Sequence, residues 1–93
     1  MNMGTWKQLE EELKQIDEQV KNDIEEIEAL ANIISAIIQK RYELGYSQRE
    51  LASICGLPQS SVARIEANLV KPNVETLLKI MKPLGLTLCP VAI

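Results

Sequence analysis

The sequence predicts an all-α protein in which two short helices meet at a tight turn, followed by one short β-strand. Apolar residues recur at intervals of three and four along most of the chain, which is typical of amphipathic helices. A capping box formed by Ser47 and Glu50 begins one helix, and Gly56 ends it. Residues 86–93 are rich in apolar and β-branched side chains and predict the strand, which Pro90 confines to an edge or a strand end.

The N-terminal part predicts two helices. Apolar residues spaced by three and four form a short heptad seam, too short to predict a coiled coil, at Trp6, Leu9, Leu13, Ile16 and Val20. Asn22 and Asp23 interrupt this seam, and Asp23 with Glu26 forms a second capping box. We therefore expect a helical leader over residues 1–22 and a new helix over residues 23–44, closed by Gly45.

Two motif helices follow, at about residues 48–55 and 59–67. Ala52 is small enough to let the second helix cross closely, and Leu57 fills the angle between the helices. Val62 and Ile65 form the buried stripe of the second helix. The opposite side carries Gln59, Ser60, Ala63 and Arg64. Another helix is expected from residue 73 to about residue 82, where Pro83 ends it.

This arrangement is a helix-turn-helix motif with polar side chains on its outer side. Gln, Ser and Arg are the side chains that hydrogen-bond to base edges and phosphates in the DNA major groove. An ordinary helical hairpin is the alternative interpretation. The combination of small, apolar and glycine residues at these positions favours binding of duplex DNA.

The same stretch closely resembles the Cro/repressor-like (XRE) helix-turn-helix family over residues 33–84. The matching segments are Ser47-Gln48, Leu51-Ala52, Gly56-Leu57, residues 62–66, Lys71-Pro72 and residues 76–78. The fold class that this implies is all-α: a five-helix domain of that family with an N-terminal helical leader and a short C-terminal β-strand. One departure is Pro58, which stands where the family usually has a Ser or Thr that can cap the helix and contact DNA.

The resemblance also implies roles for individual residues. Gln48 would contact a phosphate and brace Gln59, and the loop after the second motif helix would lie along the sugar-phosphate backbone. Arg41 and Glu66 would form a partly buried structural ion pair. The predicted DNA-binding residues are Gln48, Arg49, Gln59, Ser60, Ser61, Arg64, Asn68 and Lys71.

Composition excludes several other classes of protein. Three aromatic residues are too few for the stacking platforms of single-strand or RNA binders. The chain has no His, and Cys55 and Cys89 lack metal-ligand spacing, so we expect two buried thiols, no metal and no cofactor. Without His, a Ser-His or Cys-His nucleophile pair is impossible, and we expect no enzyme activity. No apolar run predicts a membrane span or signal peptide, so the expected location is the cytoplasm.

The net charge of −3 divides unevenly along the chain. Residues 1–30 contain three basic and nine acidic residues, a charge of −6, whereas residues 31–93 contain seven and four, a charge of +3. Such asymmetry suggests two different partners. The predicted organisation is an acidic leader (residues 1–22), a DNA-binding domain (residues 23–85) and a C-terminal strand (residues 86–93).

The predicted strand needs a hydrogen-bonding partner. Pairing with the same strand of a second copy would give a homodimer suited to a palindromic operator, since two-fold symmetry places two reading helices about 34 Å apart. The alternative is a strand that folds back on its own domain.

The leader has two open interpretations. It either packs on its own domain or binds a partner protein through Trp6, Leu9, Leu13, Ile16 and Val20, with its acids complementing a basic surface. In architecture the chain resembles antitoxins of the HigA type, which implies a repressor of its own operon that also binds a basic ribonuclease toxin. The alternatives are a stand-alone transcriptional repressor and an interaction module that no longer binds DNA.

Overall fold

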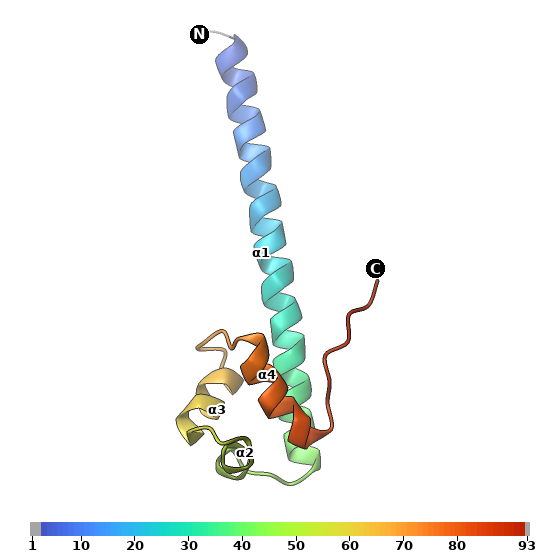
Figure 1. The fold of residues 1–93 in the computed structure, drawn as a ribbon. Coiled ribbons are helices and arrows are strands. Elements are labelled where there is room, and N and C mark those ends of the chain that lie inside the picture. Colours follow the sequence, from blue (N-terminus) through green and yellow to red (C-terminus); the bar gives the residue numbers. More distant parts are fainter. Residues whose placement is uncertain (1–2, 93) are drawn as a thin grey trace. The chain divides into compact units, whose positions relative to one another are not determined.

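The computed structural model describes residues 3–92, and four α-helices account for most of them (Figure 1). They are α1 (Met3–Glu43), α2 (Gln48–Cys55), α3 (Gln59–Glu66) and α4 (Val74–Met81), followed by a short 3-10 helix, η1 (Lys82–Leu84). The chain divides into two compact units, unit 1 up to Leu30 and unit 2 from Ala31 onward. Both units contain part of α1.

The predicted total of five helices is wrong for the described residues, because the break expected at Asn22 and Asp23 does not occur. Helix α1 continues through both residues. A capping side chain can bond to the first backbone N–H groups of a helix only where the capping residue itself is not helical. Where the chain is already helical, the same residue types are tolerated inside the helix. Here the carboxylate of Asp23 accepts a hydrogen bond from the Gln19 side chain one turn earlier (3.0 Å) and caps no backbone N–H.

The predicted C-terminal strand is also wrong. Residues 86–92 form no strand in the described structure, and after Leu86, whose N–H bonds to the Met81 carbonyl (3.0 Å), they are mostly exposed. A strand requires a neighbour for its backbone groups, and an all-helical domain offers none. Cys89, expected to be a buried thiol, is exposed on this segment, whereas Cys55 is half-buried on α2.

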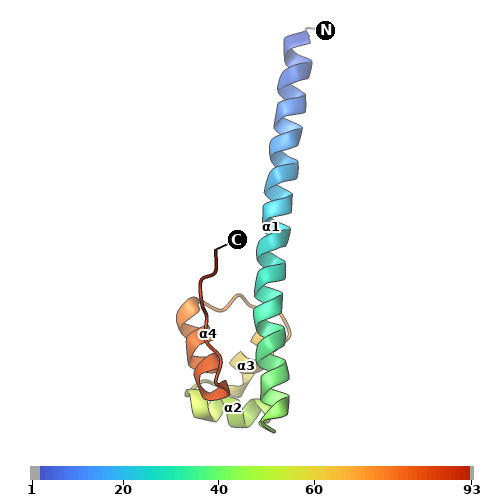
Figure 2. The ribbon, with the colours of Figure 1, turned by 90° about the vertical axis from the view of Figure 1, so that its right-hand side faces the viewer.

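Unit 2 encloses a small apolar core to which every one of its helices contributes. Helix α4 lies beside the last turns of α1 in both views (Figure 1, Figure 2). The interior side chains, all at most 5 % exposed, are Ile34, Ile37, Leu51, Ala52, Val62, Ile65, Leu77, Ile80, Met81 and Leu84. Burying this apolar surface is the main stabilising contribution to unit 2.

Local capping sets the ends of the short helices. The Ser47 hydroxyl accepts from the Glu50 N–H and the Glu50 carboxylate accepts from the Ser47 N–H, which completes the predicted capping box. Gly56 closes α2 in the left-handed region (φ 71°), which glycine adopts without steric cost. Asn73 caps α4, which ends at Met81 just before the 3-10 turn that holds Pro83. No helix in the described part of the chain is both long and apolar enough to cross a membrane.

Candidate DNA interface

Helix α3 carries exposed polar side chains on the side that faces away from the core of unit 2. Val62 and Ile65 fix α3 to the core, and Ala52 of α2, only 2 % exposed, leaves room for the close crossing of the two helices. Gln59, Ser60 and Arg64 are exposed on the opposite side. These three residues form the outer face of α3.

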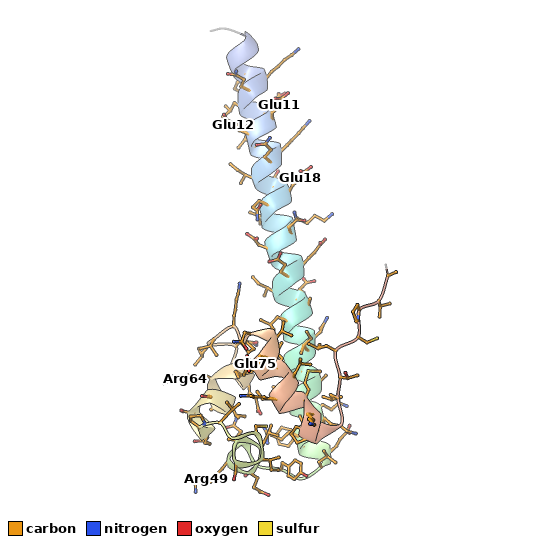
Figure 3. The ribbon with its side chains drawn as sticks, in the orientation of Figure 1. Glu11, Glu12, Glu18, Arg49, Arg64 and Glu75 are labelled. Atoms are coloured by element: carbon orange, nitrogen blue, oxygen red, sulfur yellow. The ribbon has the colours of Figure 1, made fainter. Side chains whose placement is uncertain are left out.

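The other predicted contact residues surround this face. Arg49 is exposed on α2, and Figure 3 labels it there and Arg64 on α3. Asn68 and Lys71 are exposed in the loop that follows α3. Ser61 differs from its neighbours: it is half-buried and lines a hollow.

A buried ion pair stands behind α3 and connects it to α1. The Arg41 guanidinium donates from Nε to Glu66 Oε2 (2.8 Å) and from Nη2 to Oε1 (2.7 Å), a bidentate pair. Its Nη1 donates to the Tyr46 carbonyl (2.9 Å), so each of the three guanidinium nitrogens donates a hydrogen bond. Both side chains are 7 % exposed. The hydrogen-bonded Glu66 carboxylate raises the pKa of Arg41 despite the opposing effect of burial, which keeps the guanidinium charged.

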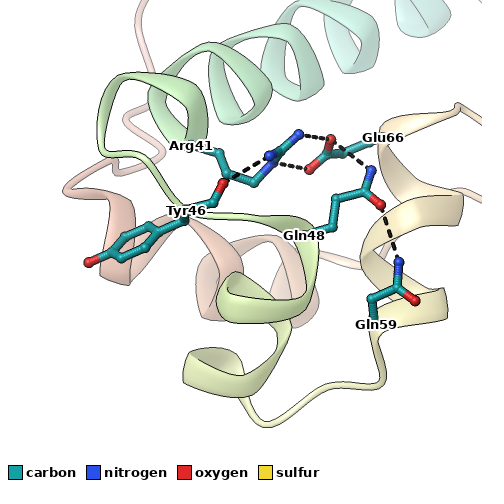
Figure 4. Close-up of polar contacts among 5 residues, drawn as sticks. All are labelled: Arg41, Tyr46, Gln48, Gln59 and Glu66. Atoms are coloured by element: carbon teal, nitrogen blue, oxygen red, sulfur yellow. Dashed lines mark hydrogen bonds and ion pairs between the residues drawn. The ribbon is translucent and has the colours of Figure 1, made fainter.

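Two glutamine amides extend this ion pair to the surface (Figure 4). Gln48 Nε2 donates to Glu66 Oε1 (3.2 Å), and Gln59 Nε2 donates to Gln48 Oε1 (3.3 Å). The first residue of α3 is therefore tied, through α2, to a charge pair held by the core. Sequence reasoning did not find the bond from Gln48 to Glu66 or the role of the Tyr46 carbonyl. Every residue type has a backbone carbonyl, so the sequence does not identify Tyr46 as an acceptor. Gly45 indicates only that the chain turns just before Tyr46.

The loop after α3 is the second region that carries predicted contact residues. Asn68 adopts a left-handed conformation (φ 59°), which Asn tolerates better than most residues, and it begins the turn that follows α3. Between this loop, α3 and the start of α4 lies a hollow of about 290 Å³. It places Arg64 and Lys71 together, and its lining consists of Leu57, Ser61, Arg64, Ile65, Val70, Lys71, Pro72, Asn73 and Thr76.

Reactive or metal-binding groups are not a feature of this surface. Burial raises the pKa of the half-buried Cys55 thiol, which lowers its thiolate fraction at neutral pH. The described residues contain no group of three or more Cys, Asp or Glu side chains arranged to hold a metal ion. The chemistry that the surface offers is hydrogen bonding and positive charge.

Two crossed helices with a short glycine turn and a polar outer helix define a helix-turn-helix DNA-binding domain. A family model described as helix-turn-helix (HTH_3) matches residues 37–91. The chain belongs to this XRE-type helix-turn-helix family of DNA-binding transcriptional regulators.

Individual relatives carry names of the same kind. The chain is 35 % identical over 85 residues to an uncharacterized HTH-type transcriptional regulator of Haemophilus influenzae, an alignment that covers 91 % of this chain and 82 % of that protein. It is 42 % identical over 48 residues to the HTH-type transcriptional regulator PuuR of Escherichia coli, which covers 52 % of this chain and 26 % of PuuR. No solved structure matches the chain. Neither relative's name mentions a toxin or an antitoxin, so the HigA-type resemblance gains no support from them.

Proposed function

We propose that this protein is a sequence-specific transcriptional repressor that inserts the outer face of α3 into the major groove of duplex DNA. The observation that carries this proposal is the hydrogen-bond chain that runs from Arg41 and Glu66 through Gln48 to Gln59. An exposed glutamine normally samples many rotamers, and ordering it costs free energy on binding. Here the amide at the start of α3 is already oriented by the core, which favours a recognition role over a merely solvated one.

The amide of Gln59 retains the groups that base recognition needs. A primary amide has two N–H donors and one carbonyl acceptor, and one donor is engaged by Gln48. The second N–H and the carbonyl can form the bidentate pair with N7 and the amino group of adenine. Gln59 is therefore assigned to direct base readout, with Ser60 beside it on the same helix face.

Phosphate contacts are assigned to the surrounding cations and the loop. Arg49 is exposed on α2, while Arg64 and Lys71 meet at the 290 Å³ hollow, where two positive charges suit a phosphate group. Asn68 in the adjoining loop, Gln48 and the hydroxyl of Ser61 add polar contacts. Such contacts fix the position of the protein on DNA without reading sequence.

Repression through a palindromic operator further requires two copies of the domain, and we propose a homodimer on DNA. A two-fold arrangement places two α3 helices about 34 Å apart, one turn of B-DNA. Selection of bound DNA from a random pool by the purified full chain tests this function. A palindromic motif with half-sites centred about 10 base pairs apart is expected. Enrichment of no motif at low salt would refute sequence-specific binding, and a single non-repeated half-site would refute the dimer.

Gln59→Ala is expected to relax base preference at one position of each half-site. The loss of a bidentate amide contact corresponds to about 1–3 kcal/mol of discrimination, or roughly 5-fold to 150-fold. Competition binding with operators substituted at each position measures this effect. The matched control is Arg49→Ala, which should weaken every operator variant alike. Equal losses on all sequences for Gln59→Ala would show that Gln59 does not read bases.

A narrower function, the antitoxin of a toxin-antitoxin pair that represses its own operon, is a second candidate. The observation that favours it is the exposed apolar stripe of the leader, since Trp6, Leu9, Leu13, Ile16 and Val20 are between 45 and 57 % exposed among many carboxylates. A contiguous apolar surface on a described unit suits a protein partner. A stand-alone repressor is the alternative. Co-expression with the product of an adjacent gene for a small basic protein distinguishes them: the antitoxin must relieve that protein's growth inhibition.

A further inference from the structure

The continuous course of α1 through Asp23 gives its apolar stripe a length that the sequence alone did not predict. With Trp6 at position a of a heptad, positions a and d run through Leu9, Leu13, Ile16 and Val20, then Asp23, Ile27 and Leu30. Ile24 stands next to Asp23, at position e. Three and a half heptads with one polar residue in the seam reach the length at which a coiled coil becomes stable.

Within unit 1 this seam has no cover. The seam residues from Trp6 to Ile27 that are apolar, together with Ile24, are between 45 and 58 % exposed. A single amphipathic helix gains stability mainly by burying its apolar stripe against another element. A second helix packed along the seam would therefore stabilise this part of α1.

The residues that flank the seam indicate what kind of helix can cover it. Positions e and g border the contact in a coiled coil and set the choice of partner. In unit 1 these positions carry four carboxylates and no Lys or Arg, namely Glu10, Glu12, Asp17 and Glu26. The three lysines of this unit, Lys7, Lys14 and Lys21, all occupy position b on the outer side.

A second copy of this chain is a poor occupant for that reason. In a parallel pair, position g of one helix faces position e of the next heptad in its partner, which sets Glu12 against Asp17. In an antiparallel pair, e faces e and g faces g, and alignment of the two seams over their full length sets Asp17 against Asp17 and Glu12 against Glu26. Asp23 at position d adds a negative charge to the seam itself. Like charges in these positions act against self-pairing.

We infer that the stripe is one strand of a heteromeric coiled coil whose other strand is a helix of a different protein, with an apolar seam and Lys or Arg at its flanking positions. A basic residue of that helix should lie opposite Asp23, whose carboxylate is presented beside the seam by its hydrogen bond to Gln19. This inference concerns unit 1 and is independent of DNA binding by unit 2. It gives a chemical description of the partner that the antitoxin candidate requires.

Binding of designed helices to the full-length chain tests the inference. The probe is a synthetic four-heptad peptide with Ile at a, Leu at d, one Lys in the seam opposite Asp23, and Lys at e and g. The comparison peptide has the same seam but Glu at e and g. Trp6 is the single tryptophan and occupies a seam position, so its fluorescence reports burial. We expect a blue shift and saturable binding with the Lys peptide and no shift with the Glu peptide. Equal binding of both peptides, or of neither, would overturn the inference.

Two variants of equal charge separate the flanks from the outer side. Figure 3 shows Glu12 on a different side of the helix from Glu11 and Glu18. Glu12→Lys with Asp17→Lys should weaken binding of the Lys peptide at least about tenfold. Glu11→Lys with Glu18→Lys, at position f, should leave it nearly unchanged. Equal losses in both variants would mean that only overall charge matters, which contradicts a coiled coil.

A seam variant tests self-association directly. Leu13→Asp with Ile16→Asp should weaken binding of the Lys peptide at least about thirtyfold, because the double substitution places carboxylates at the centre of the contact. The mass of the chain in sedimentation should be the same for this variant and the unmodified protein. A loss of dimer in the variant would show that the stripe pairs with a second copy. Operator binding is measured on the same variants and should be unaffected, so a failure of the DNA-binding proposal is recorded separately.

Discussion

Replacing Glu66 with alanine is expected to lower the free energy of unfolding of unit 2 by about 3–5 kcal/mol. The substitution leaves the Arg41 guanidinium in a site where its side chain is 7 % exposed, with the Tyr46 carbonyl as its remaining acceptor of the three described bonds. It also removes the acceptor of the Gln48 amide. Small domains are stable by only about 5–15 kcal/mol, so this loss is a large share of the total.

Urea unfolding followed by circular dichroism measures the effect of Glu66→Ala. Glu43→Ala is the matched control, because Glu43 forms an ion pair with Lys40 at 3.5 Å in which the side chains are 52 % and 40 % exposed. An exposed pair of this kind contributes at most about 1 kcal/mol. A loss for Glu66→Ala no greater than for Glu43→Ala would contradict a structural role for the buried pair.

The double variant Arg41→Met with Glu66→Leu separates the charge pair from simple packing. Replacing both members with apolar residues removes the desolvation cost along with the attraction, and such exchanges are often neutral. We therefore expect the double variant to be more stable than Glu66→Ala alone. Its Gln48 amide has still lost its acceptor, so the orientation of Gln59 should be looser even where the fold is intact.

Local signals in the sequence were sufficient to predict the motif helices. The Ser47–Glu50 capping box and Gly56 act within one or two turns of chain, and α2 begins and ends where they indicate. The same kind of signal failed at Asp23, since a capping sequence forms a cap only if the backbone turns there. The strand prediction failed because β propensity has no effect without a neighbouring strand.

Patterns in the sequence could not predict contacts between residues that are far apart in the chain. Arg41 and Glu66 are 25 positions apart, and their pairing was implied only by resemblance to a family. The outward direction of Gln59 and Arg64 followed from helical periodicity around Val62 and Ile65. The half-buried position of Ser61 did not follow from helical periodicity, because Ser61 lines a hollow together with residues of the loop after α3.

Operator affinity is expected to fall by three to four orders of magnitude between about 50 and 200 mM monovalent salt. Three or four cationic contacts per protomer, among them Arg49, Arg64 and Lys71, give a dimer about six to eight neutralised phosphates. Each contact releases condensed counterions, so the slope of log K against log salt should lie near −5 to −7. Titration of a fluorescent operator at several salt concentrations measures this slope.

Single substitutions assign the slope to particular residues. Lys71→Ala should make it less steep by about 2, one contact in each protomer of the dimer, and weaken all operators alike. Lys79→Ala removes the same charge from an exposed site on α4, outside the motif, and should leave the slope unchanged. Gln59→Ala should change base preference while the slope stays constant, because an amide displaces no counterions. A slope near zero for the unmodified protein would refute the assignment of these cations to DNA phosphates, whatever the behaviour of Gln59.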